Sequence, residues 1–269
     1  MATGTPPTVR RTIKRITRRS PHLQKFVKSG YDRYLSLYIW YLEKRHCIDG
    51  PHVGVRDTQL ISVTPSRIQK ANDPGFFFNI DPQCKVLSGN WDHNLPSFEE
   101  TFPFDAFEDH FVDEKPWSET TMYDFLEEMF AAGRSWGGYT SFPEAEERLE
   151  KIDELYNNIR QHGYLTQEEI AQNAEEHPIG IPHWANGNPI KHEIVVDIGR
   201  NGEIIFEDGR HRLAIAKILN LEEIPVQVAV RHNKWQSKRE KYVSDPSSIK
   251  MSEHPDLEIL QVNSKHSSE

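Results

Sequence analysis

Two short apolar runs joined by a tight-turn dipeptide constrain the fold of this chain more than any other feature. The runs cover residues 194–198 and 203–206, and Asn201-Gly202 between them is the strongest short-range signal for a β-hairpin. A helical pattern follows from residue 210 to a helix-stopping Asn220, and residues 224–230 then alternate as a strand. Strand, hairpin, strand, helix and strand in this order predict an α+β fold.

The length and composition allow a sizeable hydrophobic core. The 269 residues are 36% hydrophobic, which suits one or two domains, and no run of about 20 apolar residues exists to cross a membrane. The two cysteines, Cys47 and Cys84, lie far apart and form no C-x-x-C motif. This pattern argues against a disulfide framework or a cysteine-rich zinc site and fits a reducing compartment.

The charge is distributed unevenly along the chain. Net charge is −9, yet the first 31 residues carry no acid and eight bases, namely Arg10, Arg11, Lys14, Arg15, Arg18, Arg19, Lys25 and Lys28. An aromatic segment, residues 31–42, follows directly. A cleaved signal peptide is not favoured, because the apolar stretch is short and has no small-residue cleavage site. Three interpretations stay open: a helix packed on the body or on a second subunit, docking on an anionic membrane, or nucleic-acid binding through residues 10–28.

The middle of the chain predicts one strand, a loop and a block of helices. Residues 59–69 indicate an edge strand followed by a capped turn, and residues 103–185 are largely helical in pattern. Trp91-Asp92, after a Gly-Asn pair, is either a loop over a ligand or a loop pinned by a buried tryptophan. The sequence contains no H-E-x-x-H, G-x-S-x-G, Walker A or G-x-G-x-x-G motif, so no metal site is predicted and the usual hydrolase and dinucleotide-binding classes lack support.

The start of the helix predicted at residue 210 carries the chemistry. Asp208-Gly209 precedes it, and Arg210, His211 and Arg212 form its first turn. A helix start presents unpaired N–H groups and the positive end of the dipole, Gly209 permits close backbone approach, and guanidinium forks match phosphate oxygens. We therefore predict a phosphate site in which Asp208 caps the helix, holds Mg²⁺ or acts as a base. The alternative is that Asp208 only caps the helix and both arginines pair with surface carboxylates.

The same stretch resembles a known family. A strand, hairpin and strand followed by Asp-Gly-x-His-Arg, a helix and an Ile-Pro-Val strand is similar to the core of the ParB/sulfiredoxin superfamily, firmly over residues 190–232 and more weakly over 59–69. The resemblance implies a small mixed sheet, with a helical insertion at 103–185 and a helical N-terminal segment added to it. It also implies that the loop and helix start bind nucleotide phosphates.

Differences from the family pattern reduce the number of activities that the resemblance implies. Sulfiredoxins, ATP-dependent reductases of oxidised cysteine, carry their catalytic cysteine where this chain has Arg210. ParB proteins bind CTP and DNA and follow the core with a helix-turn-helix domain, whereas only 37 residues follow His232 here. The archaeal ADP-dependent serine kinases share Asp-Gly-x-His-Arg most closely, so the resemblance favours nucleotide-dependent phosphotransfer.

These observations combine into one functional hypothesis with two rivals. The chain is expected to be a cytoplasmic, kinase-like phosphotransferase that acts on an unidentified acceptor. ATP or ADP is the expected nucleotide and CTP a further candidate, and Mg²⁺ is a candidate metal. Asp208 and His211 are the catalytic candidates, and Gly209, Arg210, His211 and Arg212 the phosphate ligands. The rivals are a non-catalytic nucleotide- or nucleic-acid-binding module and an accessory protein at the inner membrane face.

The expected organisation has three parts. Residues 1–50 form the basic arm and aromatic helix, 51–235 the domain with its helical insertion, and 236–269 a polar tail. Trp91, Asp92 and Arg231 are weaker candidates for completing the nucleotide cleft.

Overall fold

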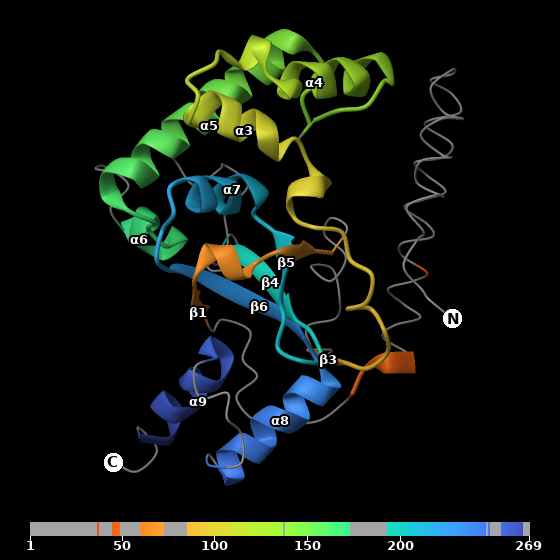
Figure 1. Cartoon of the computed structure of the whole chain (residues 1–269), viewed down its shortest axis with the longest axis vertical. Helices are drawn as coiled ribbons and strands as arrows, with labels where there is room; N and C mark the ends of the chain where they lie inside the picture. Colours follow the sequence, from red (N-terminus) through yellow and green to blue (C-terminus); the bar gives the residue numbers. More distant parts are fainter. Residues whose placement is uncertain are drawn as a thin grey trace.

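A mixed β-sheet runs through the centre of the molecule, and helices cover it, so the architecture is α+β as predicted (Figure 1). The computed structural model describes residues 37, 45–48, 60–72, 85–136, 138–172, 193–245, 247 and 254–265. The basic arm of residues 10–28 lies outside the described residues, as does nearly all of the aromatic segment 31–42.

Six strands form the sheet in the described part of the chain. They are β1 (Leu60–Val63), β2 (Lys70–Ala71), β3 (Val86–Leu87), β4 (Ile194–Ile198), β5 (Ile204–Asp208) and β6 (Ile224–His232). Their order is β1-β6-β4-β5-β2, with β3 also paired to β6. The β1–β6 and β4–β5 pairs are antiparallel, while β6–β4, β5–β2 and β3–β6 are parallel. The predicted edge strand is therefore β1, at one end of the sheet.

The predicted hairpin joins β4 and β5, but its turn lies one residue earlier than the Asn201-Gly202 pair. The N–H of Gly202 donates a 3.0 Å hydrogen bond to the carbonyl of Gly199, so Arg200 and Asn201 form the centre of the turn and Gly202 follows it. Gly202 has a φ of 98°, in the left-handed region that favours glycine. A Cβ at this position would lie 2.7 Å from the indole ring of Trp235. The turn is thus specified both by its backbone conformation and by a tryptophan from the C-terminal part of the chain.

Helix α7 (Arg210–Ile218) connects β5 to β6 and supplies the centre of the main core. Leu213 packs in one cluster with Val196, Phe206 and Val228 from the sheet. Asn220 ends the helix as predicted: it has a φ of 50°, and backbone bonds from residues 220 and 221 return to the last turn.

The chain between β3 and β4 forms a block of helices, and this block packs on the outer side of α7 (Figure 1). It contains α3 (Phe104–Phe111), α4 (Thr121–Ala131), α5 (Phe142–His162) and α6 (Gln167–Gln172), with short 3-10 turns at Glu99–Thr101 and Trp117–Glu119. One face of α5 is buried, at Ala145, Leu149, Ile152 and Ile159. Thr166 and Glu169 exchange side-chain-to-backbone hydrogen bonds at the start of α6, as a capping box does.

The segment expected as a polar tail contains two packed helices. They are α8 (Asn233–Ser244) and α9 (Pro255–Lys265), which lie at the end of the sheet away from α3–α5 (Figure 1). Trp235, Tyr242 and Leu257 are buried in the main core. The structure differs from the expectation because only a few positions of each helix face inward, too few to make the segment apolar on average.

Two findings bear on the expected compartment. Within the described residues, no helix has both the length and the apolar character needed to cross a membrane. Cys47 is disulfide-bonded, and the chain's other cysteine, Cys84, lies outside the described residues. A single such bond is not a disulfide framework, but it removes the support that the cysteine pattern lent to a reducing compartment.

Candidate functional site

The segment with the strongest chemical pattern lies where β5 turns into α7. Gly209 is the residue before the helix and has a φ of 90°. A Cβ at this position would lie 3.0 Å from the Cα of Ile194 and 3.5 Å from an Nη of Arg212. The close packing of this turn on β4 and on a guanidinium therefore requires glycine.

Asp208 is exposed at this turn. Its Oδ1 accepts a hydrogen bond of 2.8 Å from the backbone N–H of Gly209, which is itself the N-cap residue of α7 and has no side chain to cap it. The carboxylate thus contacts the residue before the helix instead of serving as the N-cap. An exposed carboxylate beside a helix start leaves an oxygen for Mg²⁺ or for the proton of an acceptor hydroxyl.

Arg212 is held by a buried carboxylate. Its Nη1 lies 3.5 Å from an Oε of Glu193 and 3.2 Å from the hydroxyl of Tyr164. The other Oε of Glu193 accepts a 2.5 Å hydrogen bond from the backbone N–H of Gln167, at the start of α6. Burial raises the pKa of Glu193, while Gln167 and Arg212 oppose that rise. This arrangement fixes the orientation of the Arg212 guanidinium.

His211 sits between aromatic rings and positive charges. Phe107 stacks on its imidazole at 5.8 Å, and Trp136 meets it edge-on at 5.9 Å. His211 as a whole is half-buried. Burial, together with Arg148 and the two arginines next to His211 in the chain, lowers the pKa of His211 to about 3. The free protein therefore holds a neutral imidazole here at physiological pH.

A third arginine approaches the helix start from the helical block. The guanidinium of Arg148, on α5, lies 4.7 Å from the centre of the Trp136 ring, and its charge affects both His211 and Arg210. Arg210 in turn lies over the ring of Phe102 at 5.8 Å. Three guanidinium groups thus lie near one helix start, among aromatic walls.

Arg148, Glu193 and Tyr164 are residues that the sequence analysis missed. A signal for Arg148 was present, since it lies three residues after Ala145 and four before Ile152 and so shares the buried face of α5. Trp136 pairs with Tyr139 across a short bridge and also contacts the site. Nothing in the local sequence links Glu193 or Tyr164 to the arginine they hold.

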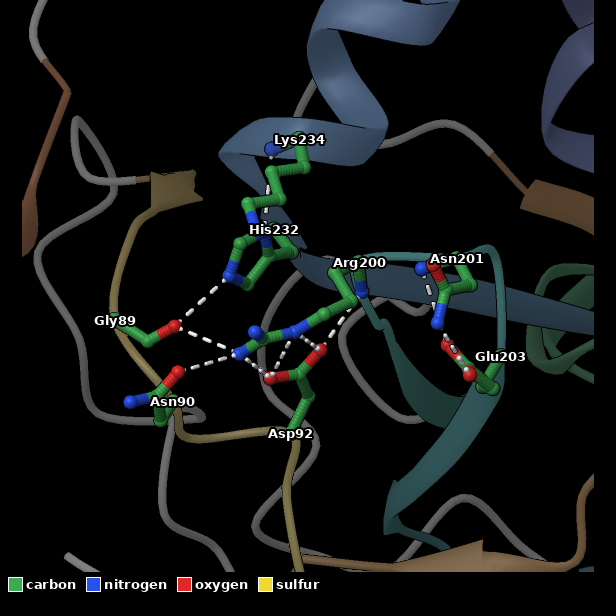
Figure 2. A network of polar contacts seen from close by, with 8 residues as sticks. All are labelled: Gly89, Asn90, Asp92, Arg200, Asn201, Glu203, His232 and Lys234. Carbon is green, nitrogen blue, oxygen red and sulfur yellow. Dashed lines mark hydrogen bonds and ion pairs between the residues drawn. The ribbon is translucent and has the colours of Figure 1, made fainter. Parts of the chain in front are cut away.

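The structure does not bring Trp91, Asp92 and Arg231 to this site. Asp92 pairs with Arg200, whose Nη2 lies 2.6 Å from its Oδ1, in the hairpin that follows β4 (Figure 2). Gly209 packs on Ile194, at the opposite end of the same strand. Asp92 therefore lies a strand length away from α7.

The other two candidates have structural contacts at that same far end. Trp91 is buried, with its ring 5.9 Å from that of His232, so the loop is pinned by a buried tryptophan. Arg231 is nearly inaccessible and pairs with Asp256 of α9 at 2.7 Å. Figure 2 shows how Arg200 bridges the 89–92 loop and the hairpin. These residues join segments of the fold.

The described residues contain no group of three or more His, Cys, Asp or Glu side chains placed to hold a metal ion. Comparison with known proteins adds no assignment, since no family model, curated protein or solved structure matches this chain. Any function must therefore be inferred from the geometry of the site itself.

Proposed function

We propose that this protein binds a nucleotide through its phosphates at the start of α7, as the ParB/sulfiredoxin superfamily does, and that it transfers a phosphoryl group to an unidentified acceptor. The observation that carries the proposal is the convergence of Arg210, Arg212 and Arg148 on one glycine-initiated helix start. Positive charge, forked donors and backbone N–H groups together suit a polyphosphate better than any other common anion.

Each residue has a distinct part in this proposal. Arg210, Arg212 and the N–H groups after Gly209 would hold the phosphates, because fixed positive charge stabilises the charge that builds up in phosphoryl transfer. Asp208 would position Mg²⁺ together with the phosphates or accept the acceptor's proton. Neutral His211 would donate or accept one hydrogen bond, and Arg148 and Trp136 would close the outer wall.

The two rival functions rest on the basic arm. Nucleic-acid binding and docking on an anionic membrane both depend on residues 10–28, which lie outside the described residues. They stay predictions, as does the inner membrane face as a location. Non-catalytic nucleotide binding uses the α7 site and differs from phosphotransfer only in the absence of turnover.

Calorimetric titration of the full chain with ATP, ADP and CTP, with and without Mg²⁺, tests the binding proposal. Wild type should bind at least one nucleotide, and Arg210→Ala should weaken binding about 10- to 100-fold, because a charge-assisted hydrogen bond contributes about 1.5–3 kcal/mol. Arg212→Ala should weaken it as well, but this change also leaves Glu193 without its ion pair. Arg210→Ala is therefore the cleaner variant.

Arg160→Ala is the matched control, because Arg160 is an exposed arginine on α5 whose guanidinium lies over Tyr156. Its loss should leave nucleotide affinity unchanged. A wild-type protein that binds none of the three nucleotides would refute the proposal. Phosphate transfer to hydroxyl-bearing acceptors can be measured by ³¹P NMR. Nucleotide binding without any transfer in that assay would favour the non-catalytic module.

A further inference from the structure

Two histidines begin the two C-terminal helices in the same way. The Nδ1 of His232 accepts a 3.1 Å hydrogen bond from the backbone N–H of Lys234, in the first turn of α8. The Nδ1 of His254 accepts a 3.1 Å bond from the backbone N–H of Asp256, in the first turn of α9. Each imidazole therefore satisfies a helix N–H that has no partner within its own helix.

The second nitrogen of each ring contacts a glycine carbonyl. The Nε2 of His232 lies 3.0 Å from the carbonyl oxygen of Gly89, and the Nε2 of His254 lies 2.9 Å from that of Gly202 (Figure 2 shows the first). A carbonyl oxygen only accepts, so Nε2 must carry the proton in both rings. Nδ1 must then be unprotonated, because it accepts from a backbone N–H.

Both imidazoles are almost inaccessible, with 1% and 3% of their surfaces exposed. Burial lowers the pKa of His232; the Gly89 carbonyl and Asp92 oppose this, while Arg200 and Lys234 add to it. The ring of Trp91 completes these surroundings.

The surroundings of His254 are of the same kind. Burial lowers its pKa; the Gly202 carbonyl and Asp256 oppose this, while Arg67 and Arg239 add to it. Trp235 of α8 lies against this ring at 4.5 Å.

We propose that His232 and His254, which we call the histidine caps, form an acid-sensitive device that holds α8 and α9 on the sheet and releases them together when the rings are protonated. Protonation turns each Nδ1 from an acceptor into a donor that faces another N–H. The cap is lost, and a buried positive charge appears beside Arg200 or Arg239.

The two caps are linked through direct contacts between their helices. Trp235 of α8 donates a 2.8 Å hydrogen bond from Nε1 to an Oδ of Asp256. The backbone N–H of Asp256 is also the group that His254 caps. His254 also contacts the hairpin that Trp235 packs on, through Gly202. Loss of either cap therefore loosens the contacts that hold the other helix, which is why joint release is expected. This inference is independent of the nucleotide proposal.

The direction of the pH effect follows from the depressed pKa values. A histidine whose pKa is lower in the folded state than the ordinary 6.5 stabilises the fold fully above pH 6.5, and its contribution falls as the pH drops toward the folded-state value. Each histidine can change the opening equilibrium by up to about tenfold per pH unit in that window.

Amide hydrogen exchange of the full chain between pH 7.5 and 5.5, corrected for the intrinsic pH dependence of exchange, tests the proposal. Protection of α8 and α9, including the capped amides of Lys234 and Asp256, should fall by up to about fivefold for each histidine from pH 6.5 to 5.5, because an open-state imidazole is already half protonated at pH 6.5. Amides of α5 should keep their protection. Parallel loss in α5 would mean that acid unfolds the whole protein, and local release would then be wrong.

The matched variant is the double substitution His232→Asn and His254→Asn. Asparagine is a good N-cap that accepts from the same N–H and does not titrate, so the pH dependence of exchange should disappear. An unchanged slope in this variant would refute the device. Nitrogen-15 NMR of wild-type imidazoles gives a second test that requires no substitution: a proton on Nδ1 at pH 7.5, or a midpoint at or above 6.5 for either ring, would also overturn it.

Discussion

Two glycines with nearly the same backbone conformation have very different surroundings. Gly202 has a φ of 98° and Gly138 a φ of 96°. A Cβ on Gly202 would meet the Trp235 ring at 2.7 Å, whereas a Cβ on Gly138 would have no heavy atom within 4 Å. Comparing alanine substitutions at the two positions separates the free-energy cost of a left-handed backbone from that of a steric clash.

Alanine at each position should therefore show two different losses of stability. Gly138→Ala should lower the free energy of unfolding by about 1–2 kcal/mol, the cost of a side chain in the left-handed region. Gly202→Ala should lower it by a further 1–3 kcal/mol or so, because the buried indole must move. Urea denaturation of both variants measures the difference. Equal losses would show that the hairpin tolerates displacement of Trp235.

At the scale of elements, α9 is joined to the sheet by a buried ion cluster. Asp256 is fully buried and pairs with Arg231 of β6 and Arg239 of α8, and it accepts a hydrogen bond from Trp235. Burial opposes ionisation of Asp256, but the two arginines hold its pKa below the ordinary 3.8. Its contribution to stability is thus present above pH 3.8 and is lost as the pH falls below it, well under the range of the histidine caps.

Asp256→Asn should be strongly destabilising. It leaves two buried guanidinium groups without their counter-charge, and loss of one partner of a buried pair costs about 3–5 kcal/mol. The contrasting variant is Glu147→Gln, which removes an exposed pair with Lys151 on α5 and should leave stability unchanged. Chemical denaturation at pH 7 compares them. A small loss for Asp256→Asn would mean that the buried ion cluster contributes little to holding α9 on the sheet.

At the scale of the whole molecule, the core extends to the C-terminal helices. Trp235, Tyr242, Leu257 and Leu260 belong to the same buried cluster as the sheet and α7. The helical block and the α8–α9 pair therefore enclose the sheet from opposite ends (Figure 1). The site at the start of α7 lies on the side of the helical block, which contributes Arg148 to it.

Removal of residues 233–269 should consequently destabilise the rest of the molecule strongly without unfolding it. The truncated chain loses four large side chains from its core and exposes the sheet end that they cover, and deletion of even one large core side chain costs about 2–5 kcal/mol. The sheet and helical block should nevertheless keep a near-ultraviolet circular dichroism signal and melt cooperatively at a lower temperature, as local release of α8 and α9 requires. Loss of the near-ultraviolet signal and of cooperative melting would show that the sheet and helical block cannot fold without α8 and α9.

Much of the central fold was predictable because its signals are local. The hairpin signalled by Asn201-Gly202 and the helix stop at Asn220 each depend on residues within a few positions of one another, so their patterns are visible in the sequence. The position of Asp208–Arg212 at a helix start follows from the same kind of signal.

Packing between distant segments decided the rest. The sequence alone determined which residues begin α7, but the fold brought Arg148 and Glu193 to that helix and kept Asp92 at the other end of β4. It also placed Asp256 between two arginines, which made a polar segment part of the core. Such contacts leave no periodic trace in the chain, because the free energy of a buried charge depends on partners supplied by other elements, not on its neighbours in sequence.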